Sequence, residues 1–218
     1  MTKRFSALLL LMAALAFGLV ACGDDGSSSS SDGSTASADP VAEINELTGD
    51  NTQVTFDQGF VDALGDLGLK PGGVGDAKFV MGGAAAQFPI TGGNVTYFDP
   101  SSDVRPYVQG IINHEGSGLS LDSGDVKVEL TDFVVDPGAS TLTGTVSANG
   151  EVAAEGALLF DLDGSTLKPL AMEGGAAVLE GTEVLLSADA AALLNETFGV
   201  DALEEGFPIG VAKISVTG

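Results

Sequence analysis

The sequence has few cations, one histidine, one cysteine and no tryptophan. Its 218 residues hold 8 Lys and Arg against 31 Asp and Glu, which gives a formal charge of -23 at pH 7. Nucleic acid is excluded as a partner, because a phosphate backbone requires a basic surface. One cysteine excludes a disulfide framework and a thiolate metal cluster, and one histidine leaves no second imidazole for a His-rich metal site. The apolar content of 44% is nevertheless sufficient for one hydrophobic core.

The most specific motif lies at the N-terminus. Lys3 and Arg4 precede an uncharged apolar run over residues 7–20, and the run ends in Leu19-Val20-Ala21-Cys22. A positive start, a short apolar run and small residues at its end are typical of a secretory signal, and the run is too short to span a bilayer comfortably. Leu19-Val20-Ala21-Cys22 resembles the lipobox of bacterial lipoproteins. That resemblance implies a diacylglycerol on the Cys22 sulfur and cleavage just before Cys22. The alternative is a buried or transmembrane helix with an incidental cysteine.

The lipobox divides the chain into three parts. Residues 1–21 are the expected signal peptide. Residues 22–53 are the expected lipid-anchored cysteine and flexible tether, because residues 23–40 are rich in Ser, Gly and Asp and have little apolar area to bury. Residues 54–218 are the expected single extracytoplasmic domain. We therefore expect a protein held on the outer face of the cell membrane through Cys22. Removal of Lys3 and Arg4 would change the formal charge to -25.

The domain is predicted to be mainly β. Residues 125–135 and 141–147 alternate apolar and polar side chains, with Val126, Val128 and Leu130 on one face. Asn149-Gly150 predicts a two-residue hairpin, and residues 151–162 predict a long strand with a bulge at Gly156. Strands at this spacing indicate an antiparallel β-sandwich or an open barrel.

Two segments interrupt the β pattern with similar helical signals. Residues 58–67 follow Asp57 and precede Gly68, and residues 188–198 follow Ser187 and precede Gly199. Asp and Ser are preferred N-cap residues, and Gly is preferred just after a helix. We expect two short helices that cap an open end of the sheet.

Few residues are candidates for chemistry. His114 is expected at a strand end beside a glycine-rich turn, as a ligand or proton acceptor; the alternative is a solitary surface histidine on a hairpin. There is no Gly-x-Ser-x-Gly elbow, so a hydrolase has little support and we expect no enzyme. Asp161-Leu162-Asp163-Gly164 resembles the opening of a calcium loop, but it lacks the later acidic ligands and predicts a turn, so we expect no metal site.

A longer stretch carries a second resemblance. Phe88-Pro89-Ile90, residues 110–121 around His114 and residues 126–130 resemble the central motif of HtaA-type haem-binding domains, which are β-rich modules of the bacterial envelope. The resemblance implies haem as cofactor, with a tyrosine as axial ligand and the later histidine, here His114, as its partner. Phe60 stands where the family has that tyrosine, so Tyr97 and Tyr107 are the alternative phenolates.

These observations predict a non-enzymatic envelope protein that binds a small ligand, with haem as the sharpest candidate, or an envelope component. The competing hypothesis is a structural or adhesive surface module without a pocket, and an envelope hydrolase is the least favoured. An apolar cavity of roughly a few hundred Å³ would favour ligand binding over the adhesive module.

Overall fold

A computed structural model describes residues 39–218. The predicted signal peptide, Cys22 and the first part of the predicted tether lie outside these residues. Within them the chain forms thirteen strands, two α-helices, α1 (Gln58–Asp66) and α2 (Ala188–Phe198), and a short 3-10 turn at Met81–Gly83. The strands are β1 (Ala42–Ile44), β2 (Gly49–Phe56), β3 (Lys70–Gly75), β4 (Lys78–Val80), β5 (Ala85–Pro89), β6 (Gly92–Tyr97), β7 (Val108–Asp122), β8 (Lys127–Asp136), β9 (Thr141–Ala148), β10 (Glu151–Asp163), β11 (Ala171–Glu173), β12 (Ala176–Leu186) and β13 (Pro208–Thr217).

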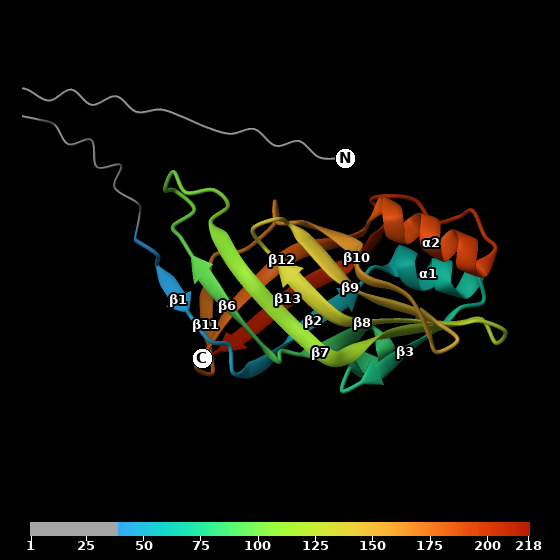
Figure 1. The fold of residues 1–218 in the computed structure, drawn as a ribbon. Helices are drawn as coiled ribbons and strands as arrows, with labels where there is room; N and C mark the ends of the chain where they lie inside the picture. The colour runs from blue at the N-terminus through green and yellow to red at the C-terminus, as the bar shows by residue number, and fades with distance from the viewer. Residues whose placement is uncertain (1–38) are drawn as a thin grey trace, which may run out of the picture. The chain divides into compact units, whose positions relative to one another are not determined.

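All the strands belong to one antiparallel sheet that curls into a half-barrel (Figure 1). The strand order is β1-β6-β7-β8-β9-β10-β12-β13-β2-β5-β4, with β3 paired to β7 and β11 paired to β12 outside this path. The sheet does not close on itself, since β1 and β4 are its two ends. The mainly β class is therefore confirmed, and of the two predicted architectures the chain adopts the open barrel.

The central meander follows the alternation in the sequence. Val128 and Leu130 on β8 are buried, and Glu129 between them is half-buried on the other face. Asn149 and Gly150 have positive φ values of 51° and 84°, as the predicted hairpin turn requires. Gly156 has φ 61° and lies where the β9–β10 register shifts, so the predicted bulge is confirmed.

Both predicted helices are present with their predicted caps. The Asp57 side chain accepts a hydrogen bond from Gly59 N, and the Ser187 side chain accepts one from Ala190 N. Gly68 and Gly199 follow the helices with φ values of 68° and 67°. Figure 1 shows the two helices together at one end of the half-barrel, opposite the loop between β6 and β7.

The ordered strands begin earlier than the predicted domain boundary. β1 and the first half of β2 fall within residues 22–53, the stretch assigned to the tether. Residues 49–53 lack an apolar alternation, and their strand is fixed by its neighbours instead: β2 pairs with β13 on one side and β5 on the other. Leu47, between β1 and β2, is buried at 3% exposure.

Candidate ligand-binding pocket

The end of the half-barrel away from the helices holds a pocket of about 320 Å³. Its walls come from β1, β6, β7, β8, β10, β12 and β13, and its rim from the loops that follow β6, β8 and β10. No charged side chain of the described residues lines it. The apolar side chains that line it include Val95, Val108, Ile112, Val135, Leu162, Leu167, Leu170, Leu179, Ile214 and Val216.

Strand register brings these side chains onto one surface. Tyr97 pairs with Ala42 on one side and with Val108 on the other. Leu179 pairs with Ile214, and Ala177 pairs with Val216. Residues two apart on a strand point to the same face, so each of these strands contributes side chains to a single concave wall.

Two tyrosines form the main polar feature of the pocket. The rings of Tyr97 and Tyr107 are perpendicular, with centroids 5.9 Å apart, and both line the cavity. Among the described residues neither phenol hydroxyl takes part in a hydrogen bond, and no buried side-chain polar atom lacks a partner. Tyr97 is buried at 5% exposure, and Tyr107 is half-buried. These two residues are the candidate phenolates of the sequence, and the structure brings them together.

Four carboxylates lie in or next to the three rim loops: Asp99 and Asp103 in the loop after β6, Asp136 at the end of β8 and Asp163 at the end of β10. Asp99 accepts hydrogen bonds from the Ser101 backbone and hydroxyl at 2.7 Å, Asp136 accepts one from Ala139 N at 2.9 Å, and Asp163 accepts one from Ser165 N at 2.8 Å. These bonds to Ser101 and Ser165 hold the pKa values of Asp99 and Asp163 below the usual range of a carboxyl. Asp163 stabilises a turn, as predicted. No group of three or more metal-ligating side chains is found in residues 39–218.

His114 lies inside the molecule, away from this pocket. Its side chain is 1% exposed, so the surface-histidine alternative is wrong. Thr52 Oγ1 lies 2.8 Å from Nε2, and the Phe133 carbonyl lies 3.4 Å from Nδ1. A carbonyl can only accept, so Nδ1 carries the proton and Nε2 accepts from the threonine hydroxyl. Burial lowers the pKa of His114 to about 4, although its bond to Phe133 opposes this.

The glycine-rich stretch after His114 is also different from the expected turn. β7 continues through it to Asp122, with a register shift between His114 and Gly118 in its pairing with β8. A side chain on Gly118 would overlap the Leu130 carbonyl oxygen of β8. The glycine is thus required for close strand approach at a bulge.

The histidine and the two tyrosines do not share a site. His114 lines a separate cavity of about 40 Å³ with Thr52, Phe88 and Phe133. Val135 lies between this cavity and the larger pocket and lines both. Thr52 has no recognisable signal in the sequence, because it falls in the stretch assigned to the tether.

Phe60, which the resemblance in the sequence sets at the position of the family's tyrosine, belongs to the hydrophobic core. It is 7% exposed and its ring centroid lies 5.5 Å from that of Phe56. It has no oxygen for a metal. The residues present therefore do not fit the tyrosine–histidine haem site that the resemblance implies, since the nearest polar partner of His114 is Thr52.

The fold and the pocket define a class: an antiparallel half-barrel with two helices at one end and an apolar cavity at the other. The crystal structure of the C-terminal domain of HtaA from Corynebacterium glutamicum is similar, with a TM-score of 0.54 over 80% of this chain and 99% of that chain, at 15% identity. This likeness shows a shared fold. No protein-family model matches the sequence, and no curated protein matches it significantly. No helix in residues 39–218 combines the length and apolar character needed to cross a membrane.

Proposed function

We propose that this protein is a non-enzymatic envelope module, held on the outer face of the cell membrane through lipid on Cys22, that binds a small apolar molecule. The observation that supports it most is the pocket of about 320 Å³ lined by aliphatic side chains and two tyrosines. Ligand sites are typically concave, largely apolar and roughly 300–1,000 Å³ in volume, with a few polar groups. A surface module that works by adhesion has no need of such a cavity.

Haem is the second candidate, and the presence of Tyr97 and Tyr107 in the lining of the pocket favours it. The position of His114 argues against it, because its Nε2 is bonded to Thr52 and its ring lies in a different cavity. Titration with haemin separates the candidates. We expect no Soret shift on addition of the protein. A shift that is lost in Tyr97→Phe or Tyr107→Phe would support haem instead.

The test of pocket binding uses a neutral fluorescent probe, N-phenyl-1-naphthylamine, whose emission rises in apolar surroundings. We expect saturable binding that is weakened at least tenfold by Val216→Phe, because the larger side chain fills the pocket. A tenfold loss of affinity corresponds to about 1.4 kcal/mol, and burial of one apolar group the size of a side chain contributes about 1.5–3 kcal/mol. Val216 lines the pocket, whereas Val211 on the same strand is 42% exposed and does not. Val211→Phe is therefore the matched control.

Ile214→Phe provides a second filling variant if Val216→Phe folds poorly, because Ile214 is only partly buried and also lines the pocket. Urea unfolding of each variant separates loss of binding from loss of structure. Absence of probe binding by the wild-type protein, or equal binding by all three variants, would overturn pocket binding and favour the adhesive module.

A further inference from the structure

We propose that the ligand of this pocket is an apolar molecule with one positive charge, an amine or a quaternary ammonium, whose charge lies against Tyr97 and Tyr107. This inference rests on the proposed function and adds the chemistry of the ligand's polar end. Three observations support it: the two aromatic rings line the pocket, carboxylates lie at its rim, and the nearby cations already have hydrogen-bond or ion-pair partners.

The tyrosine pair has the geometry of an aromatic corner. The two rings pack edge to face at 90°, with centroids 5.9 Å apart, and both residues line the cavity. The face of an aromatic ring attracts a cation within about 6 Å, and such contacts strengthen where water is excluded. A carboxylate placed against these rings would instead meet their negative faces.

The two tyrosines flank the base of a loop whose carboxylates have no ion-pair partner. Tyr97 ends β6, Tyr107 immediately precedes β7, and Phe98 N donates to the Tyr107 carbonyl at 2.7 Å, which closes the base of the loop. Asp99 and Asp103 belong to this loop. Neither has a cation within 4.0 Å among the described residues, where the ion pairs are Lys127–Glu129, Lys168–Glu180 and Lys213–Glu173.

A second acidic turn lies beside the same loop. A Cβ built on Gly138 would be 3.9 Å from Pro106 Cγ, so the β8–β9 turn approaches the end of the loop closely. Asp136 caps that turn through Ala139 N, and Pro137 lines the pocket. Asp163 caps the third rim loop. The carboxylates of the rim therefore bond backbone amides and hydroxyls, and their charges are left uncompensated.

The cations near the rim are already engaged. The Arg105 guanidinium donates to the carbonyls of Pro100, Ser102 and Val104 at 2.6–2.9 Å, within its own loop. Lys168 Nζ lies 2.6 Å from a Glu180 oxygen. Arg105 keeps its charge in these bonds, but it is one cation against the four unpaired carboxylates Asp99, Asp103, Asp136 and Asp163, so the rim attracts a cation more strongly than an anion. Binding of haem is disfavoured for the same reason, because haem carries two negatively charged propionates.

The experiment compares three ligands with the same twelve-carbon chain, each displacing the naphthylamine probe below its micelle concentration. They are dodecyltrimethylammonium, dodecanol and dodecanoate. We expect the ammonium to displace the probe at a concentration roughly tenfold lower than dodecanoate, the size of one favourable cation–π contact. The preference should shrink at high ionic strength, because salt screens the rim charges.

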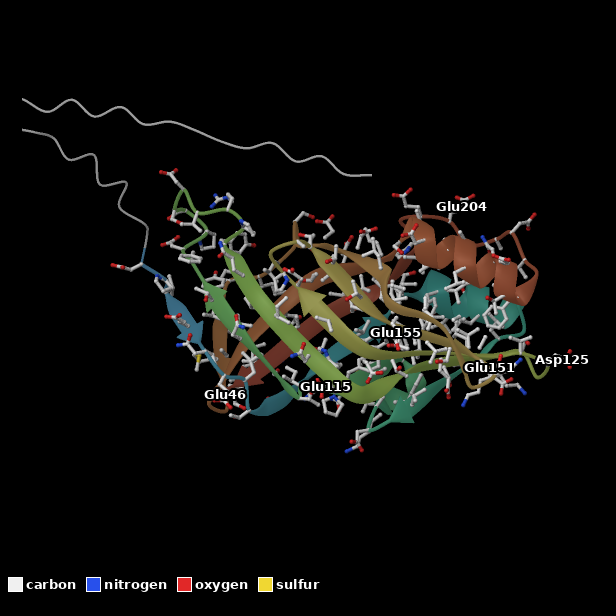
Figure 2. The ribbon with its side chains drawn as sticks, viewed as in Figure 1. Glu46, Glu115, Asp125, Glu151, Glu155 and Glu204 are labelled. Atoms are coloured by element: carbon white, nitrogen blue, oxygen red, sulfur yellow. The ribbon has the colours of Figure 1, made fainter. Side chains whose placement is uncertain are left out.

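Two sets of variants test whether the preference for the ammonium comes from the rim carboxylates or from the negative charge of the whole chain. The set Asp99→Asn, Asp136→Asn and Asp163→Asn removes three rim charges while each Asn keeps an oxygen for the loop hydrogen bond. The control set Asp125→Asn, Glu151→Gln and Glu155→Gln removes three charges elsewhere, with Asp125 and Glu151 near the helical end in Figure 2. We expect the preference to fall in the first set and to remain in the second.

The tyrosine corner is tested by Tyr107→Leu, which should reduce ammonium binding and leave dodecanol binding nearly unchanged, while Tyr107→Phe keeps the ring and the preference. Equal displacement by dodecanoate and the ammonium would overturn the inference, as would an equal loss of preference in both charge sets. These outcomes leave the proposed function intact. Failure of every ligand and of the probe would overturn the proposed function itself.

Discussion

His114 connects two strands that are far apart in the sequence. Its ring on β7 accepts a hydrogen bond from Thr52 on β2 at 2.8 Å, and both side chains are buried. The sequence identified this histidine as unusual but could not give its surroundings. Its burial depends on the curl of the sheet, which brings β7 and β2 to the same interior, and not on the residues beside it.

The histidine should make the stability of the protein pH-dependent. Its pKa is about 4 in the folded protein and near 6.5 when unfolded. The unfolded state therefore binds the extra proton between these values, so the free energy of unfolding is highest above pH 6.5 and falls as the pH is lowered to 4. The loss over this window is roughly 3 kcal/mol.

Urea unfolding at several pH values tests this expectation. His114→Gln should have a shallower decline in stability between pH 6.5 and 4 than the wild-type protein. Thr52→Val keeps the buried imidazole, so it should keep the steep decline while losing about 1–2 kcal/mol at pH 7. Parallel curves for the wild-type protein and His114→Gln would contradict the assignment of the decline to this residue.

The helices are the elements that local sequence predicted best. Asp57 and Ser187 are both N-caps, as the pattern indicated, but their surroundings differ. Asp57 is exposed and accepts from Gly59 N at 2.7 Å. Ser187 is fully buried; its hydroxyl accepts from Ala190 N at 3.1 Å and donates to the Leu158 carbonyl of β10 at 2.8 Å. The capping bond joins residues that are close in the sequence and can be predicted from it. The bond to Leu158 depends on how α2 packs against β10.

The two caps should therefore contribute unequally to stability. Ser187→Ala removes two buried hydrogen bonds and should lower the free energy of unfolding by about 2 kcal/mol. Asp57→Ala, its matched control on α1, should lower it by about 0.5–1 kcal/mol. Urea denaturation midpoints measure both. A larger effect at Asp57 would show that the contact between α2 and β10 contributes little.

In β7 the turn predicted from the glycines after His114 is wrong. Gly116 and Gly118 predicted a turn, because glycine most often marks one. In the structure the strand passes through, and Gly118 allows the backbones of β7 and β8 to approach at a bulge. A glycine in a strand and a glycine in a turn have the same local signal, and only the neighbouring strand distinguishes them.

At the scale of the whole molecule, the charge and the expected anchor act together. The formal charge of -23 disfavours close contact with an anionic bilayer surface. Attachment through lipid on Cys22, followed by a polar tether, would hold the domain at the membrane without requiring its surface to bind lipid.

The anchor is tested by Cys22→Ser in a bacterial host. We expect the wild-type protein to incorporate labelled fatty acid and to partition into the detergent phase of Triton X-114. Cys22→Ser should lose the label, because serine has no thiol to form the thioether. Ser29→Ala, a control in the expected tether, should behave like the wild-type protein. Equal labelling of Cys22→Ser would contradict the lipobox assignment.

The sequence by itself determined the β class, the meander of β8, β9 and β10 with its turns, and both helices with their caps. Each of these depends on local alternation or on residues that tolerate special backbone angles. Tertiary structure alone decided that the sheet stays open, that β2 begins at Gly49, and that His114 meets Thr52. It also decided that Tyr97 and Tyr107 share a pocket under an acidic rim. These features join residues distant in the chain, and their positions are set by the order and curl of the strands.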